Sequence, residues 1–81
     1  MPRIRYFAQA REVAGTAAEE LAGTTVAEML AAAVERHGER FAAVLASSAV
    51  WLDGEPCGPG DSVAIDAELA VLPPVSGGFA G

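Results

Sequence analysis

The chain contains no lysine, a single cysteine and no long run of apolar residues. Its basic residues are five arginines set against eleven acidic residues, so the formal net charge is -6. Nucleic-acid binding requires Lys and Arg to neutralise phosphates, so a nucleic-acid partner is disfavoured. A phosphate-binding P-loop needs a lysine and is excluded. An acidic surface instead suits solubility and docking to basic surfaces of protein partners.

Cysteine, histidine and long apolar stretches are also scarce, and this limits the kinds of site that the chain can form. Cys57 is the only cysteine and His37 the only histidine, so neither an internal disulfide nor a clustered metal site is expected. No stretch approaches the roughly 20 apolar residues that cross a membrane. Arg3 and Arg5 interrupt the first apolar run, so no signal peptide is expected. These features predict a cytoplasmic protein without a metal site or a membrane partner.

The 81 residues, 52% of them apolar, are enough for one small domain. Strand formers at 4–8 predict a first strand, in which Arg3 and Arg5 alternate with Ile4 and Tyr6 and leave Phe7 on the polar side. Residues 9–15 predict one short helical turn, stopped by Gly15. Residues 19–21 predict a short second strand, which is weakly encoded.

The strongest helix signal begins at Thr25. Thr25 can cap a helix, and Glu28 lies three residues later, as a capping box requires. Apolar residues then recur at helical spacing as far as Val34. His37 lies in the last turn, and Gly38 is predicted to end the helix in a left-handed cap. We interpret His37 as a helix-terminus residue, because no nucleophile or carboxylate stands beside it in the sequence.

The second half of the chain predicts a short helix and three strands. Residues 41–45 favour the helix, and residues 49–52 a strand. Asp53-Gly54 is typical of a tight hairpin turn, and Pro56 makes the returning segment an edge piece because proline has no N–H. Residues 68–72 form the last strand. This order predicts an α+β domain with the main helix on one face of a mixed sheet, whose first and last strands can pair in parallel at its centre.

The familiar catalytic arrangements are missing from the sequence. The acids Asp61, Asp66 and Glu68 lie near loops and are interpreted as turn-forming, solvated side chains. Cys57 follows a proline beside a turn, and no cation adjoins it in sequence to activate its thiol. The remaining candidate is the C-terminal tail. Pro73-Pro74 ends the last strand, and Gly77-Gly78 follows on an arm that reaches roughly 20 Å when extended. A glycine-rich end that is simply frayed is the alternative interpretation.

At these residues the chain resembles a known family. It is similar, over nearly its whole length, to the small subunit of molybdopterin synthase (MoaD), one of the ThiS-like β-grasp sulfur carriers. The matching segments are Arg5-Tyr6-Phe7-Ala8, Arg11-Glu12 with Gly15, Thr25-Val26-Ala27-Glu28, Asp53-Gly54-Glu55 and Glu68 to Gly78. The ending Pro-Pro-Val-Ser-Gly-Gly is the most specific match, because thiazole-pathway carriers share the Gly-Gly but usually lack the Pro-Pro.

The resemblance implies a ubiquitin-like β-grasp fold, with four to five strands packed on one main helix. It divides the chain into a domain at 1–72 and an extended tail at 73–81. It also implies that an E1-like enzyme adenylates the carboxylate of Gly78, next to Gly77, with ATP and magnesium. Sulfur transfer then makes a thiocarboxylate, which serves molybdenum cofactor synthesis. The carrier would bind no cofactor and would be a subunit and co-substrate without a catalytic constellation of its own.

The resemblance further implies a docking patch at Phe7, Leu72 and Val75, continued by Pro73 and Pro74. The partners would be the E1-like enzyme and, separately, the large synthase subunit, with which the chain would form a heterotetramer. Two features depart from the family. Residues 65–68 replace its usual turn before the last strand, and Phe79-Ala80-Gly81 follows the Gly-Gly pair.

The three added residues leave three interpretations open. A protease removes them and exposes Gly78, or Gly81 itself is the carrier, or the chain cannot be charged. The function is correspondingly open between molybdenum cofactor synthesis, another sulfur pathway (cysteine, thiazole or a secondary metabolite) and a non-catalytic interaction module.

Overall fold

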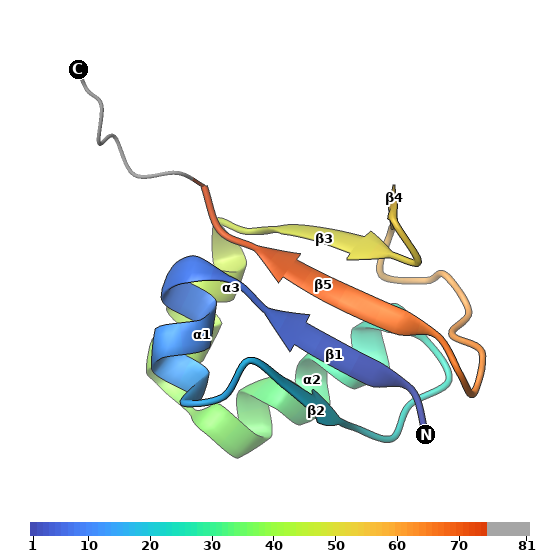
Figure 1. Cartoon of the computed structure of the whole chain (residues 1–81), viewed down its shortest axis with the longest axis horizontal. Helices are drawn as coiled ribbons and strands as arrows, with labels where there is room; N and C mark the ends of the chain where they lie inside the picture. The colour runs from blue at the N-terminus through green and yellow to red at the C-terminus, as the bar shows by residue number, and fades with distance from the viewer. Residues whose placement is uncertain (75–81) are drawn as a thin grey trace.

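Within residues 1–74, a five-stranded mixed sheet with three helices forms the fold (Figure 1). This computed structural model describes residues 1–74. The strands follow the order β2-β1-β5-β3-β4 across the sheet. The elements are β1 (Arg3–Tyr6), α1 (Ala8–Ala14), β2 (Ala18–Glu20), α2 (Val26–His37), α3 (Glu39–Ala46), β3 (Ala49–Leu52), β4 (Glu55–Pro56) and β5 (Glu68–Leu72).

The first and last strands pair in parallel at the centre of the sheet, as the sequence predicted. Ile4 pairs with Leu69 and Tyr6 with Val71, and all four side chains are almost completely buried. The alternation of β1 places Arg3 and Arg5 on the open face. Parallel neighbours need a long crossover, which the helices supply on the other face of the sheet. This architecture is the α+β, ubiquitin-like arrangement that was expected.

The helices differ from the sequence prediction in extent. The expected single turn at 9–15 is a seven-residue helix, α1, which Gly15 closes with a left-handed φ of 76°. The first residue of α1, Ala8, has a positive φ of 49°, because the chain turns sharply from β1 into the helix. Strand β2 begins at Ala18, one residue before the predicted 19–21 segment, and Leu21 is buried just beyond its end.

The capping box of α2 is present with one change. Thr25 Oγ1 accepts a hydrogen bond of 3.2 Å from Glu28 N, as predicted. The Glu28 carboxylate reaches back to the N–H and hydroxyl of Thr24, at 2.7 and 2.9 Å, and so satisfies the residue before the cap. The prediction of a left-handed cap at Gly38 is wrong: its φ is 89° but its ψ is -167°. The extended ψ sends the chain directly into α3, for which Gly38 is also the N-cap.

The hairpin between β3 and β4 has the predicted turn. Both Asp53 and Gly54 have positive φ, 51° and 85°, which a type I′ turn requires. Asp53 also ties the turn to β5, because its N–H donates to Glu68 O at 2.8 Å and its carboxylate accepts from Glu68 N at 2.9 Å. Of the acids near the loops, Asp61 acts in a turn as the sequence indicated, because its carboxylate accepts a hydrogen bond of 2.9 Å from Gly58 N.

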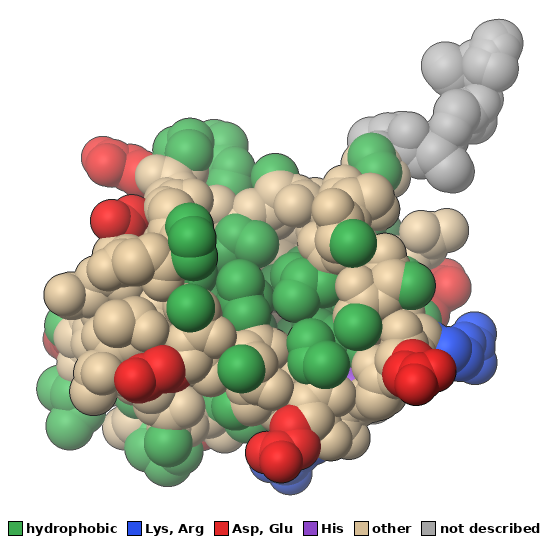
Figure 2. All heavy atoms as spheres, turned by 180° about the vertical axis from the view of Figure 1, so that it is seen from behind, with side chains coloured by type: hydrophobic (Ala, Val, Ile, Leu, Met, Phe, Trp, Pro, Cys, Tyr) green, Lys and Arg blue, Asp and Glu red, His purple; other side chains and the backbone are tan. Residues whose placement is uncertain are grey.

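One apolar core lies between the sheet and the helices. Its buried members are Ile4, Tyr6, Ala10, Leu21, Val26, Met29, Ala33, Phe41, Val63, Ala67, Leu69 and Val71. Seen from behind the sheet, apolar side chains gather in the hollowed centre of the molecule and acidic side chains stand around it (Figure 2). The core holds the carboxyl ends of β1 and β5 together, and the tail follows directly after β5.

Candidate docking surface at the base of the carrier tail

The base of the tail lies where β1 and β5 end side by side (Figure 1). Strand β5 ends at Leu72, so Pro73 and Pro74 stop it as expected from proline's missing N–H. Leu72 and Pro73 are partly exposed, and Pro74 is exposed. The domain boundary after residue 72 stays a prediction, because most of the tail lies outside the described residues.

Phe7 lies beside this base. Its N–H donates to Val71 O at 3.2 Å, which continues the parallel pairing one residue past β1 and places Phe7 next to Leu72. Phe7 is also the N-cap of α1 and is only partly buried. The Arg5 guanidinium lies over its ring, 5.2 Å from the centroid, so Phe7 shares the open side with the arginines as predicted. The structure brings together three of the predicted docking residues, Phe7, Leu72 and Pro73.

Pro74 of the predicted patch is described and exposed, whereas the remaining predicted site residues lie outside the described part of the chain. Val75 of the docking patch and the carrier candidates Gly77, Gly78 and Gly81 all belong to residues 75–81. Their assignments remain predictions.

Trp51 is an exposed aromatic residue on β3 that the sequence analysis placed in a strand without a role. It is 37% exposed, and it pairs across the sheet with Ala70 of β5. The alternation of residues 49–52 beside the hairpin was a signal that could have placed it on the open face. The surface at the base of the tail thus continues over the sheet.

A polar cluster joins β1, β2 and the end of α2 behind this face. The Glu19 carboxylate accepts hydrogen bonds of 2.6 Å from the Tyr6 hydroxyl and 2.6 Å from His37 Nε2, and it pairs with Arg36 Nε at 3.2 Å. Burial opposes the charge on Glu19, but the hydrogen bonds and nearby positive charge outweigh it and lower its pKa. Burial, then the bond to Glu19, raise the pKa of Tyr6.

This cluster gives His37 a structural role. The His37 ring also stands edge-on to Tyr6, with centroids 5.5 Å apart. His37 lies in the last turn of α2, as predicted, and within residues 1–74 no nucleophile accompanies it in this cluster. The arrangement connects the helix to the edge strand β2.

Among the residues described, neither the Cys57 thiol nor the acidic side chains form a reaction centre. Burial and the neighbouring Asp61 raise the pKa of Cys57, and its thiol donates to Val50 O at 3.4 Å, so the thiolate is disfavoured. Across residues 1–74, no group of three or more His, Cys, Asp or Glu side chains could hold a metal ion.

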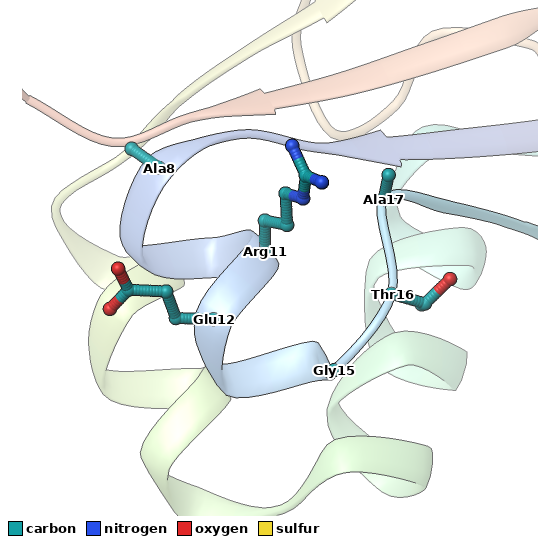
Figure 3. A pocket seen from close by; sticks show the side chains of 6 residues that line it. All are labelled: Ala8, Arg11, Glu12, Gly15, Thr16 and Ala17. Atoms are coloured by element: carbon teal, nitrogen blue, oxygen red, sulfur yellow. The ribbon is translucent and has the colours of Figure 1, made fainter.

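A hollow with a volume of about 510 Å³ lies between α1 and the loop into β2. In Figure 3 its side chains point apart: Arg11 extends toward the sheet, whereas Glu12 and Thr16 point to opposite sides. A small-molecule site needs a few polar groups that converge, and this hollow does not provide them. No helix in the described part of the chain is long and apolar enough to cross a membrane.

Comparisons with known proteins agree with this architecture. The profile of the ThiS family matches residues 4–78. SAMP1 from Haloferax volcanii is 31% identical, with 94% of this chain and 97% of that chain covered and a TM-score of 0.80. A protein assigned as molybdopterin converting factor subunit 1 from Pyrococcus furiosus is 25% identical, with 91% and 97% covered and a TM-score of 0.79.

A third solved structure supports the fold alone. A chain of the BexX/CysO complex from Amycolatopsis orientalis is 22% identical, with 95% and 99% covered and a TM-score of 0.80. Among curated proteins, none matches the chain. Within residues 1–74, the family match begins at the second residue of β1 and covers every later strand and helix. The chain therefore belongs to the ThiS family of small ubiquitin-like β-grasp sulfur carriers.

Proposed function

We propose that this chain is a sulfur carrier for molybdenum cofactor biosynthesis, with the carboxylate of Gly78 as the site of charging. The observation that carries the proposal is the coincidence of the family match, which ends at Gly78, with an apolar surface at the base of the tail. One molybdopterin converting factor subunit among the similar structures supports the pathway. The Pro-Pro-Val-Ser-Gly-Gly ending agrees with it.

The chemistry needs a partner, because the described residues supply no catalytic group. The Gly78 carboxylate attacks the α-phosphate of ATP on an E1-like enzyme, and pyrophosphate leaves. A hydrosulfide equivalent then attacks the acyl carbon, AMP leaves, and a thiocarboxylate remains. Magnesium on the enzyme neutralises the phosphates. Glycine suits this position because a Cβ would obstruct close approach of the backbone to the enzyme.

The base of the tail supports this use. Phe7, Leu72 and Pro73 offer an apolar surface, and the prolines stiffen the start of the arm. A partner that binds this surface fixes the position from which the arm extends. In this proposal Val75 completes the patch. The same surface binds first the E1-like enzyme and then the large synthase subunit, with which the carrier forms a heterotetramer.

Residues 79–81 require one more step in this proposal. Gly78 is followed by Phe79-Ala80-Gly81, so its carboxyl is in a peptide bond until a protease hydrolyses the Gly78–Phe79 bond. Charging at Gly81 without cleavage is the alternative, and another sulfur pathway (cysteine, thiazole or a secondary metabolite) would use the same processed end.

Intact-mass measurement tests the proposal. Full-length chain and chain ending at Gly78 are each incubated with ATP, magnesium, a sulfide donor and the E1-like enzyme of the same organism. The form that ends at Gly78 should gain the mass difference between sulfur and oxygen. A gain on the full-length form alone would assign the site to Gly81, and no gain on either form would refute the carrier function.

A second function, protein modification, is favoured by the 31% identity to SAMP1, a small archaeal modifier protein. There an amine of a target protein would attack the same acyl adenylate, AMP would leave and an amide bond would form. Within these 81 residues no lysine can accept a second copy. Incubation with host lysate and ATP, followed by detection of covalent adducts on target lysines, distinguishes this function from sulfur transfer to a small molecule.

A further inference from the structure

The inner face of β3, which is turned toward the helices, is less covered than the inner face of its neighbour β5. Val50 pairs with Val71 and Leu52 with Leu69, so these four side chains project to the same face of the sheet. Val71 and Leu69 of β5 are completely buried, whereas Val50 and Leu52 of β3 are only half-buried. The helices therefore cover the central strands and leave part of β3 open.

Apolar side chains of α2 border this open part of β3. Arg36 pairs with Glu19, so that flank of α2 faces β2. Val34 is about 200° around the helix from Arg36, and Leu30 lies one turn before Val34 on the same flank. Both are half-buried against the core. Because β2 and β3 lie on opposite sides of the central strands, Leu30 and Val34 face β3.

Helix α3 closes the third side. Its Phe41 is buried in the core, and its Val44 and Arg40 line a hollow between α3 and α1. Leu45 lies on the other side of Phe41, toward α2, and is half-buried. One depression is thus surrounded by five apolar side chains and is called the α2–β3 hollow: Leu30, Val34, Leu45, Val50 and Leu52. It is the apolar, hollowed centre of the helix side in Figure 2.

The rim of the α2–β3 hollow is acidic. Glu55 of β4 pairs with Leu52 and so projects to the hollow side of the sheet. Glu35 follows Val34 on α2, and both glutamates are exposed. Acidic side chains stand around the hollow in Figure 2, whereas arginines appear only at the outer edge of that view.

All five arginines face other parts of the molecule, and the chain has no lysine. Arg3 and Arg5 lie on the open face of the sheet. Arg36 forms its ion pair toward β2, and Arg11 and Arg40 line the hollows beside α1. Within residues 1–74, no lysine or arginine therefore lines the α2–β3 hollow, and the acids on its rim give it a negative potential.

We propose that the α2–β3 hollow is a second docking site, which takes a basic amphipathic segment of a partner protein. The segment places one or two apolar side chains in the hollow and sets Lys or Arg against Glu35 and Glu55. An apolar patch rimmed by polar residues is typical of a protein-binding site. Opposite charge across the contact guides the approach of the partner and selects it over acidic segments.

The second site is separate from the base of the tail. Phe7 and Leu72 lie on the open side of the sheet, whereas the hollow lies on the helix side. A segment bound in the hollow therefore leaves the docking patch free for the enzyme that charges the tail. The proposed site adds a partner to the carrier function and does not depend on that function.

Titration with a synthetic peptide tests the site. The probe is a helical peptide with Leu on one face and Lys on the other, and its control has Glu in place of Lys. Full-length chain with ¹³C-labelled Leu and Val methyl groups is titrated with each. The Lys peptide should shift the methyl resonances of the hollow, with a Kd that rises as salt is added. Shifts that avoid the hollow, or equal binding of the Glu peptide, overturn the inference.

Matched variants provide the second measurement. Val34 and Val13 are both half-buried valines on helices, but Val13 lines the hollow between α1 and α3. Val34→Arg fills the α2–β3 hollow with a positive side chain and should raise the Kd for the Lys peptide by about tenfold or more. Val13→Arg should leave it within about twofold. Equal effects of the two substitutions overturn the inference, and circular dichroism checks that each variant folds.

A charge variant on the exposed surface keeps the test independent of the core. Glu35→Gln should weaken binding of the Lys peptide and reduce its salt dependence, because one charge pair is lost. Glu12→Gln is the control, since Glu12 lines the hollows beside α1. The inference is overturned if the two variants bind equally well.

Three other occupants are outcomes of the same experiment, and each overturns the inference. Hollow resonances that differ between full-length chain and chain ending at Gly78 would assign the hollow to residues 79–81. Resonances that shift with the concentration of the chain alone would assign it to a second copy. Displacement of the Lys peptide by the E1-like enzyme would assign it to that enzyme.

The second site and the carrier function fail in different ways. If the intact mass rises by the oxygen-to-sulfur difference while the Lys peptide does not bind, the carrier function stands and the second site is refuted. If the peptide binds in the hollow while no mass is gained, the second site stands and the carrier function is refuted.

Discussion

The Tyr6 hydroxyl donates a 2.6 Å hydrogen bond to the Glu19 carboxylate, and this bond joins the central strand β1 to the edge strand β2 from within the core. Tyr6 is 1% exposed, and the side chain of Glu19 is 14% exposed. The same Glu19 oxygen accepts from His37 at the end of α2. A short strand of three residues is therefore held by side chains as well as by its ladder.

Removal of the Tyr6 hydroxyl tests this connection. Tyr6→Phe keeps the ring, which stands edge-on to Phe41 at 5.4 Å, and removes only the donor. A hydrogen bond to a charged group contributes about 1.5–3 kcal/mol, so the free energy of unfolding should fall by about that amount. Urea denaturation measures it. Combined with Glu19→Gln in a double-mutant cycle, the two losses should be less than additive, and strict additivity would show that the pair is not coupled.

The free energy of unfolding should depend on pH through the carboxylate of Glu19. Its folded pKa is lower than the ordinary value of 4.5, so its contribution is complete above pH 4.5 and is lost as pH falls through the lowered folded pKa. We expect the difference in unfolding free energy between the wild type and Glu19→Gln to be largest near neutral pH and to shrink below about pH 4.5. Denaturation at a series of pH values measures this difference. A constant difference from pH 7 to pH 3 would contradict the assignment.

The N-cap of α2 provides a prediction about local structure. Thr25→Ala removes the oxygen that accepts from Glu28 N and should cost about 1 kcal/mol, in the range of measured cap losses. Thr25→Ser keeps the oxygen and is the matched control, with an expected loss of a few tenths of a kcal/mol. Thermal unfolding compares the two, and equal losses would mean that the cap contributes nothing.

Gly23 approaches α2 too closely to carry a side chain. A Cβ at this position would lie 2.8 Å from Met29 Cγ and 3.1 Å from the Met29 backbone nitrogen. Gly23→Ala should therefore destabilise the fold by about 1–3 kcal/mol, the cost of overpacking a filled site. Gly60→Ala is the control, because nothing lies within 4 Å of a Cβ there. Similar midpoints for the two variants in urea would refute the close approach.

Phe7 should matter for docking and little for folding. Phe7→Ala removes a partly exposed ring at the base of the tail and the platform under Arg5. We expect the Kd for the E1-like enzyme to rise by about tenfold or more, with circular dichroism unchanged. Gln9→Ala, two residues further on the exposed side of α1, is the control. An unchanged Kd for Phe7→Ala would remove this residue from the docking patch.

Local signals in the sequence were enough for most of the elements. The capping residues of α2, the Asp53-Gly54 turn and the stop at Pro73 each depend on the conformational preference of one or two residues, and all three are present. Helix α1 is longer than predicted because packing of Ala10 in the core stabilises residues whose local pattern is weak. The error at Gly38 arose because a positive φ permits several values of ψ, and the start of α3 selects the extended one.

The candidate site, like the fold, could be predicted from the sequence only in part. The tail motif can be recognised in the sequence, because proline restricts the backbone and glycine frees it wherever they occur. The docking face is not, because its members come from strands far apart in the chain. Only the register of β1, β5 and β3 brings Phe7, Leu72 and Trp51 to one side, and only burial distinguishes Trp51 from a core residue.

What the sequence by itself determined is therefore the list of elements, the absence of lysine and clustered metal ligands, and a tail that ends a strand and runs to Gly-Gly. Only the tertiary structure decided that Glu19 joins Tyr6 to His37, and that an aromatic and an arginine flank Ala70 beside the tail. The physical reason is the distance along the chain over which each kind of interaction acts. Backbone preferences act within a few residues, whereas strand pairing and side-chain contacts depend on where the whole chain places its segments.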